Sequence, residues 1–300
     1  MATLHRALSL VLAGMPALAM AALNDIFPTD HIALPDGKKN VALYAFNQDT
    51  SGPYKNGSKT TAGEIGANLY GLRIGKHYSF GDNGQYTFGP LAVLTWGEGT
   101  PNAALQSTLG TGTSGYGDLR LGSALWFHID RENREYAMVS ASALLPTGTY
   151  DKTKALNYGE NRYRYVLSAG WMRSLSDKWV FDLAPEVVYY GDNTEYWYRL
   201  NNRNNRLSQD VSYALGGILR YRVTPAFQLY AGTVFNGGGA TQLNGAAYTG
   251  APGNTRVNAG MMLIEAGKQQ MHLRFGRDVS INNGFAVDRE IALRYSAFFD

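Results

Sequence analysis

Two positions in this sequence carry residue types that perform chemistry in other proteins. His77 and Ser79 are separated by a single residue, and a histidine base next to a serine hydroxyl is the pairing that activates a nucleophile for ester hydrolysis. Such a base needs a third side chain to orient it, and none is apparent near the pair. Catalysis by His77 and Ser79 is therefore kept only as an alternative to an ordinary role in a turn.

The remaining histidines and the glycine-rich runs suggest no cofactor chemistry. The five histidines lack metal-ligand spacing, and a chain without cysteine has no thiolate ligand and no thiol redox centre. The run from Gly110 to Gly117 precedes a predicted strand rather than a helix, which argues against phosphate binding. We therefore predict no metal and no cofactor. A net charge of +3 without any basic run also argues against a nucleic-acid partner.

A larger set of ionisable side chains shares one parity along a series of alternating segments. It contains eight arginines, six acidic residues and no lysine: Asp118, Arg120, Arg162, Arg164, Asp182, Glu186, Arg220, Arg222, Arg256, Arg274, Asp278, Asp288, Glu290 and Arg294. Arginine pairs bidentately with carboxylates, so this composition suits an enclosed interior of low dielectric. Two interpretations stay open. The network either fills and rigidifies that interior or forms a polar constriction past which small molecules move.

The elements that position these charges are about twelve segments in which apolar and polar residues alternate with a period of two. In 179–190, Trp179, Phe181 and Leu183 share one parity, whereas Asp182 and Glu186 share the other. The predicted strands cover 38–47, 64–78, 85–97, 115–128, 135–146, 161–174, 178–190, 207–223, 226–236, 254–266, 269–280 and 287–299. With 35 glycines, 20 tyrosines and 17% charged residues, the chain is predicted to be all-β.

Two features favour a membrane barrel over a soluble β-sandwich, which would alternate in the same way. Aromatic residues lie at both ends of the apolar stripes, as Tyr163 and Trp171 do, which is typical of the girdles of a lipid-facing band. Short turns also alternate with long loops near 48–62, 98–114, 149–160, 192–206 and 237–253. We predict a closed antiparallel transmembrane β-barrel of about 12 strands over 38–300, with the short turns in the periplasm. So narrow a barrel leaves little room beyond its side chains, which favours the filling interpretation of the ion network.

The two ends of the chain predict where this barrel is made and placed. Residues 1–22 have the charged start, apolar run and small-residue exit of a cleaved signal peptide. Residues 23–37 follow as a periplasmic N-terminal segment, either a loose tail or a partial plug of the lumen. The final alternation, with Tyr295 and Phe299, resembles the C-terminal signal that the barrel-assembly machinery recognises, although Asp300 follows it. We therefore expect export to the outer membrane of a Gram-negative cell.

Three short motifs lie within the stretch 115–191. They are a Gly-x-Gly-Asp opening, an LPTGTYD segment and a Gly-x-Asn segment, and their residues include Gly115, Gly117, Asp118, Leu145, Pro146, Gly148, Tyr150, Asp151 and Asn161. With these motifs the chain resembles the meta-pathway phenol-degradation family of outer-membrane proteins. The resemblance implies a barrel that admits hydrophobic or aromatic growth substrates. Pro146 and Gly148 also have a structural explanation, because they end a strand before a long loop.

Together these observations predict a channel rather than an enzyme. The expected role is passive uptake of small hydrophobic or aromatic compounds, which the outer loops capture before they descend a narrow lumen. Pro90 and Pro185 lie mid-strand, where a missing N–H weakens the ladder, and are candidate points for a sideways exit. The expected partners are outer-membrane lipid, the barrel-assembly machinery and a small hydrophobic ligand. A barrel without transport activity and a lipid-modifying enzyme using His77 and Ser79 remain the alternatives.

Overall fold

The computed structural model describes residues 27–197 and 202–300. The predicted signal peptide and residues 23–26 lie outside the described residues. Among the described residues, no helix is both long enough and apolar enough to cross a membrane.

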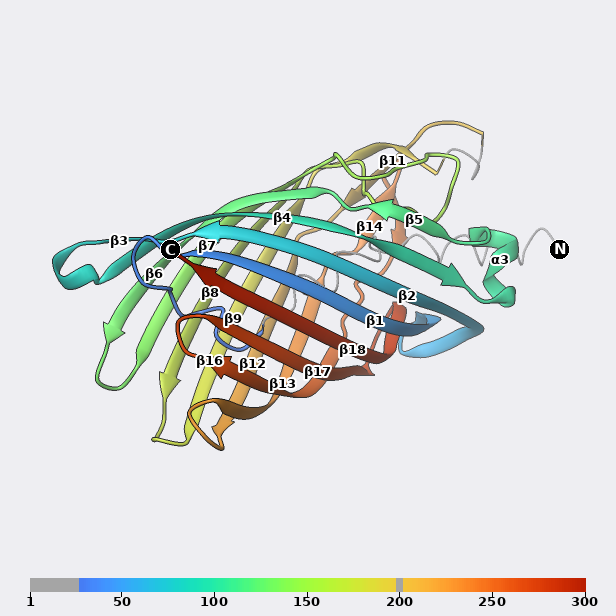
Figure 1. The fold of residues 1–300 in the computed structure, drawn as a ribbon. Helices are drawn as coiled ribbons and strands as arrows, with labels where there is room; N and C mark the ends of the chain where they lie inside the picture. The colour runs from blue at the N-terminus through green and yellow to red at the C-terminus, as the bar shows by residue number, and fades with distance from the viewer. Residues whose placement is uncertain (1–26, 198–201) are drawn as a thin grey trace.

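Twelve antiparallel strands form one closed barrel (Figure 1). The strands are β1 (Lys39–Lys55), β2 (Ser58–Lys76), β4 (Tyr86–Pro101), β6 (Leu119–Asp130), β7 (Glu135–Leu145), β8 (Arg164–Ser174), β9 (Trp179–Tyr190), β12 (Ser212–Arg222), β13 (Phe227–Gly238), β16 (Thr255–Glu265), β17 (Gln269–Ser280) and β18 (Gly284–Phe299). Each strand pairs with its neighbour in the sequence, and the ring closes because β1 pairs with β18. The predicted fold class and strand number are confirmed.

The alternation in the sequence corresponds to the inner and outer faces of this barrel. On β8 the side chains of Arg164 and Val166 are buried, whereas those of Tyr165 and Leu167 are each 51% exposed. The same pattern recurs around the ring and puts large apolar side chains on the outer surface. Every backbone group must find a partner inside a membrane, so a closed ring with an apolar exterior is the form that strands can take there.

The connections differ in length at the two ends of the barrel, as predicted. Short turns join β6 to β7, β8 to β9, β12 to β13 and β16 to β17, at the end where β1 begins and β18 ends. The opposite end carries helix α3 (Ala103–Leu109), the strand β5 (Thr113–Tyr116) and a separate four-stranded sheet (Figure 1). That sheet consists of β10 (Asn193–Tyr196), β11 (Asn205–Gln209), β14 (Thr241–Leu243) and β15 (Ala246–Thr249). The strand β3 (Tyr78–Phe80) follows β2, pairs with β4 and is joined to it by the short turn η1 (Asp82–Gly84).

Two predicted boundaries were wrong. The region 48–62 is not a long loop, because β1 and β2 continue and meet in a tight hairpin at Asn56 and Gly57. Both residues have positive φ, 49° and 78°, which is the conformation that an Asn-Gly hairpin turn favours. The segment 207–223 is also not one strand. Its first residues belong to β11 in the outer sheet, and the barrel strand begins only at Ser212.

Candidate functional site

The predicted ionic residues lie mainly on the inner face of the barrel. Ten of the fourteen have buried side chains: Asp118, Arg162, Arg164, Asp182, Arg220, Arg256, Arg274, Asp278, Glu290 and Arg294. Arg120 and Glu186 are half-buried, and Arg222 is half-buried beside the turn that joins β12 to β13. Strands β8 to β18 therefore present a wall of paired charges to the interior.

Asp288 does not belong to this wall, and the prediction for it was wrong. The β1–β18 register pairs Asp49 with Arg289 and Thr50 with Val287, so Asp288 is the extra residue of a β-bulge. A bulge shifts the parity of the strand by one residue, and the Asp288 side chain is exposed. The parity rule could not locate this interruption from the sequence.

Three carboxylates organise the arginines in the middle of the barrel. Asp182 accepts two hydrogen bonds from Arg220, at 2.7 Å from Nε and 3.0 Å from Nη2. Glu290 accepts two from Arg274, at 3.1 Å from Nε and 2.7 Å from Nη2. Asp278 accepts a bond of 2.9 Å from Arg256 Nε. Planar bidentate pairing of this kind is what arginine offers and lysine does not, which explains why the set contains no lysine.

A fourth carboxylate, Glu160, was not predicted. It lies in the loop between β7 and β8, where Glu160 accepts hydrogen bonds from Arg162 Nε at 2.8 Å and from Arg164 Nη1 at 2.6 Å. The ring of Tyr190 lies under both guanidinium groups, 4.7 Å and 5.1 Å from their central carbons. The Gly-x-Asn motif in the sequence flanks Glu160 on both sides, but nothing in the pattern assigned it an ion-pairing role.

Several family motif residues meet at Asp118, which lies next to Glu160. Asp118 accepts a hydrogen bond from the Gly148 N–H at 2.9 Å and another from the Glu160 N–H at 3.0 Å. A Cβ atom at Gly148 would lie 2.8 Å from the Asp118 carboxylate, so only glycine fits there. The motifs thus tie the long loop between β7 and β8 to the start of β6.

The other motif residues make local contacts in the same loop. Gly115 has a φ of 151°, and a Cβ atom there would collide with Thr149. The Tyr150 hydroxyl donates to the Glu195 carbonyl at 3.1 Å, and Asp151 accepts a bond from the Thr153 N–H at 2.8 Å. Asn161 has a φ of 53°. Gly117, Leu145 and Pro146 lie where β6 begins and β7 ends. These contacts support the structural explanation of the motif.

Glu160 predicts a pH dependence for this loop. Burial would raise the pKa of its carboxyl, but the charges of Arg164 and Arg162 outweigh burial and lower the pKa from 4.5 to about 2. A depressed folded-state pKa contributes stability that is present above pH 4.5 and is lost as the pH falls toward 2. We expect the Glu160 carboxyl resonance to titrate near pH 2, and amide hydrogen exchange in the loop between β7 and β8 to accelerate in the same range. The variant Glu160→Gln should exchange quickly at every pH. Ordinary titration near pH 4.5 would contradict the pairing.

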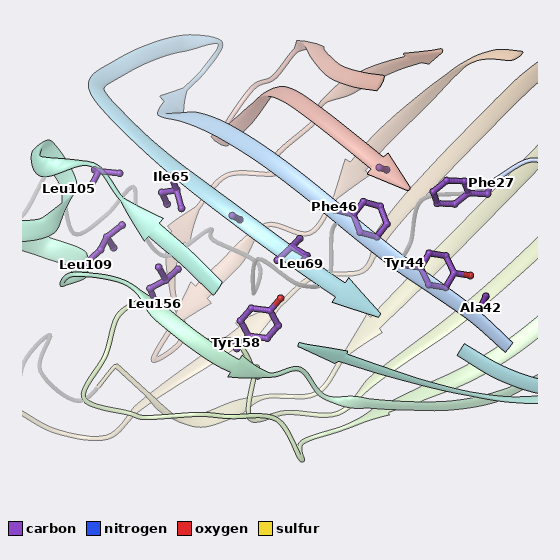
Figure 2. Close-up of a cluster of buried hydrophobic side chains, with 12 residues drawn as sticks. Phe27, Ala42, Tyr44, Phe46, Ile65, Leu69, Leu105, Leu109, Leu156 and Tyr158 are labelled. Atoms are coloured by element: carbon purple, nitrogen blue, oxygen red, sulfur yellow. The ribbon is translucent and has the colours of Figure 1, made fainter. Parts of the chain in front are cut away.

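The opposite side of the interior is apolar, which the sequence analysis missed. One cluster of buried side chains joins Ala42, Tyr44 and Phe46 of β1 to Ile65, Ala67 and Leu69 of β2. It continues toward the loop end through Leu105 and Leu109 of α3 and through Leu156 and Tyr158. Figure 2 shows these side chains as one row that extends from α3 to Phe27. The signal was present in the sequence, because the middle of β1 and the first half of β2 carry apolar residues on the parity that carries charges elsewhere.

The first described residues lie among inward-facing side chains of the barrel. Phe27 is 1% exposed, and its ring centre lies 4.4 Å from the guanidinium carbon of Arg274 and 4.8 Å from that of Arg294. Asp30 accepts a hydrogen bond of 2.7 Å from Arg294 Nη1 and lies 3.5 Å from Arg73 Nη1. His31 is 2% exposed, and its Nδ1 is 3.7 Å from Asp182. We refer to residues 27–31 as the inner segment.

A cavity of about 130 Å³ lies between the inner segment and the barrel wall. Leu91, Val93, Trp126 and Met138 line it on one side, and Arg73 and Arg120 contribute polar groups. An apolar cavity of about 150 Å³ is large enough to bind benzene in another protein. The space therefore has the size of a single-ring molecule.

His77 and Ser79 do not form a catalytic pair in the structure. The Nδ1 atom of His77 accepts a hydrogen bond from the Leu34 N–H at 3.3 Å. Ser79 Oγ lies 3.1 Å from Thr87 Oγ1. Each side chain thus has a different partner. Within the described residues, no group of three or more His, Cys, Asp or Glu side chains is arranged to hold a metal ion.

Comparisons with known proteins identify the family. The model of the family described as "Putative MetA-pathway of phenol degradation" matches residues 47–289. The chain belongs to this family. The resemblance inferred from 115–191 is confirmed, and it extends over most of the barrel. No curated protein sequence matches the chain.

Solved structures show the same architecture. The COG4313 outer membrane channel from Pseudomonas putida F1 is 29% identical, with a TM-score of 0.85 over 92% of this chain and 100% of that one. The β domain of the Bordetella autotransporter BrkA is 16% identical, with a TM-score of 0.55 over 88% of this chain and 100% of that one. At that identity the second match concerns the fold alone. The chain is an outer-membrane β-barrel similar to a channel.

Proposed function

We propose that this protein is an outer-membrane channel for passive uptake of small hydrophobic or aromatic compounds. The observation that carries the proposal is the apolar row inside the barrel, which extends from α3 at the loop end to Phe27 (Figure 2). The stability of the barrel does not require a continuous apolar row beside the paired arginines. The family description, which refers to phenol degradation, supports the same class of compound.

The two walls give the proposed path its selectivity. A small apolar molecule gains free energy by moving from water onto the apolar row, at about 25 cal/mol per Å² of apolar surface that it buries. The buried arginines on β8 to β18 are paired mainly with carboxylates, and a small apolar molecule cannot replace those contacts. Entry at the loop end would be driven by the concentration gradient of the compound itself.

We also propose that residues 23–37 act as a partial plug, which the buried contacts of Phe27, Asp30 and His31 support. Residues 1–22 would be the signal peptide that directs export. Tyr295 and Phe299 would form the signal for the barrel-assembly machinery, since both face outward on β18 at 40% and 49% exposure.

A test of the proposed function is uptake of labelled toluene by cells with and without the protein, at matched outer-membrane levels. We expect faster uptake with the protein, and we expect the variant Ala67→Asp to abolish the gain, because a carboxylate interrupts the apolar row between Ile65 and Leu69. The matched control is Ser142→Asp on β7, which adds the same charge beside Arg120 of β6, whose Nε lies 2.8 Å from the native Ser142 hydroxyl. Equal loss in both variants would mean that the apolar row is not the path.

A second candidate function, a barrel that does not transport, is favoured by one observation. The inner segment and several paired arginines are buried inside the barrel, where Arg294 also binds Asp30. No gain in toluene or phenol uptake by a folded barrel would support this candidate over the channel.

A further inference from the structure

The strands β17, β18, β1, β2 and β4 lie side by side in the barrel (Figure 1), and a row of polar side chains crosses their outer surface. On each strand these side chains alternate with buried side chains that face the interior. The row consists of Arg277, Arg289, Asp49, Asn47, Asn68 and Glu98, all of them exposed or half-buried. We refer to these residues as the polar row.

Hydrogen bonds join most members of the polar row to one another. Arg289 donates to Asp49 at 2.8 Å and to Asn47 at 3.0 Å. Asn47 donates to Asn68 at 2.9 Å, and Asn68 donates to Glu98 at 3.0 Å. These contacts lead from strand to strand and cross the pair β1–β18 that closes the barrel. Neighbouring strands are about 4.8 Å apart, so a row across five strands is roughly 19 Å wide.

The polar row lies where the lipid-facing apolar surface ends, on the side of the long loops. Between Arg277 and the short turn before β17, the outward-facing residues are Gln269, Met271, Leu273 and Phe275, none of which is charged. On β2 and β4, the next outward residues toward the short turns are Tyr70 and Trp96, whose rings stack 5.9 Å apart. Aromatic residues mark the edges of the apolar band of a membrane barrel. The row is therefore at the level of the lipid head groups.

Other strands end their lipid-facing surface differently. Tyr165 on β8, Tyr189 on β9, Tyr213 on β12 and Phe235 on β13 lie toward the same end of the barrel, and each is about half exposed. No charged residue faces outward beside them on these strands. A feature that the membrane boundary alone required would recur around the ring. The polar row is confined to one side, which indicates a specific contact there.

Arg277 is the member of the row without a partner. It forms no hydrogen bond or ion pair with any described residue. Because Gly276 pairs with Glu290, Arg277 and Arg289 occupy neighbouring places on β17 and β18. Like charges beside each other on a sheet are destabilising, and Asp49 neutralises only one of the two. The bulge residue Asp288 is exposed but forms no ion pair with either arginine among the described residues. One positive charge is thus left for an anion from outside the protein.

We propose that Arg277 and Arg289 bind a phosphate group of a phosphorylated glycolipid in the leaflet on the loop side of the membrane. Guanidinium groups bind phosphate oxygens through two parallel hydrogen bonds, which suits an arginine at the level of the head groups. The acyl chains of the lipid would lie along the apolar surface of β17 and β18, where Phe275 is 49% and Leu293 is 42% exposed.

The width of the polar row favours a glycolipid over an ordinary phospholipid. A single glycerophosphate head group reaches the two arginines but leaves Asn47, Asn68 and Glu98 without a ligand. The amide of each asparagine donates one hydrogen bond within the row, and an amide group has two N–H donors. The second donor and the Glu98 carboxylate suit the hydroxyl groups of a sugar. Bound lipid would brace the closing pair β1–β18, and this role is independent of what passes through the barrel.

The test measures the temperature at which the purified, folded barrel unfolds in detergent, with increasing amounts of diphosphorylated lipid A. We expect this lipid to raise the unfolding temperature more than the same lipid without its phosphates. The variant Arg277→Gln should need about tenfold more lipid for the same rise, since it loses charge-assisted hydrogen bonds. The matched control is Arg173→Gln, because Arg173 is also outward and 47% exposed but lies at the short-turn end of β8. It should respond as the native barrel does.

Three results would overturn the proposal. Equal protection of the native barrel by the phosphorylated and the phosphate-free lipid would exclude a phosphate site. Native behaviour of Arg277→Gln would exclude this pair of arginines. Equal protection by phosphatidylglycerol or by inorganic phosphate, at matched phosphate concentration, would exclude the glycolipid as the specific ligand.

A second variant covers the case in which Arg277→Gln does not fold. Asp49→Asn removes the carboxylate that Arg289 binds, so both arginines become available to the phosphate. We expect this variant to reach the same rise in unfolding temperature with severalfold less lipid A than the native barrel. Weaker or unchanged binding in a folded Asp49→Asn barrel would contradict a role for Arg289 in the site.

Discussion

Replacing Glu290 with glutamine should destabilise the barrel by about 3–5 kcal/mol, the usual cost of removing one partner from a buried ion pair. The Glu290 side chain is 1% exposed and accepts hydrogen bonds from Arg274 and from Gln48 Nε2, the latter at 2.6 Å. Arg256 Nη1 also lies 3.5 Å from it. Glutamine keeps the shape but removes the charge, so the buried Arg274 guanidinium loses the charge of Glu290.

Urea-induced unfolding in phospholipid vesicles measures this effect, and an exposed pair provides the control. Asp49 and Arg289 lie on the adjacent strands β1 and β18, but their side chains are 51% and 54% exposed. Asp49→Asn should therefore cost no more than about 1 kcal/mol, as exposed pairs do. The double variant Arg274→Met with Glu290→Gln should be more stable than Glu290→Gln alone, because both charges are then removed. Equal costs for Glu290→Gln and Asp49→Asn would refute the idea that burial makes the difference.

These arginines show how far the sequence could predict the site. The period of two gave the face of Arg220 and Arg274 correctly, because every residue of a barrel strand faces either the lumen or the lipid. It could not assign partners, since the pairing of Arg274 with Glu290 depends on the register between β17 and β18. The same register places a bulge at Asp288, where the parity rule fails.

Other features depended on contacts between distant segments. Asp30 lies in a segment without periodicity, and only the fold brings it to Arg294, 264 residues later. The apolar parity of β1 and β2 was readable, but it looks the same as the outward face of other strands until closure fixes which side is inside. The interruption of the β8–β9 pairing at Ala169 and Gly170 was partly predictable, because Pro185 was identified as a weak point from its missing N–H. Pro90, identified for the same reason, is paired to β6 without interruption, but on its other side it lies where the pairing of β4 passes from β2 to β3.

Replacing Asp30 with alanine should release the inner segment and raise the ion conductance of the barrel in planar bilayers. Asp30 joins the segment to the wall through Arg294 Nη1, and it also accepts a hydrogen bond from the Phe27 N–H at 3.0 Å. Hydrogen bonds to charged groups contribute about 1.5–3 kcal/mol each, so losing the Arg294 contact shifts the balance between seated and released segment by roughly tenfold to a hundredfold.

The control for this prediction lies in the same part of the chain. Asp36 is outside the inner segment, and its carboxylate accepts a hydrogen bond of 2.7 Å from the Ser79 N–H near a short turn. Asp36→Ala should therefore leave conductance at the native level. Phe27→Ala should act in the same direction as Asp30→Ala, because it removes the ring that lies between Arg274 and Arg294. Native conductance in a folded Asp30→Ala barrel would mean that the segment does not limit the lumen. A rise in conductance would mean that the segment closes an aqueous path, and the same release would move His31 away from Gly170 of β8.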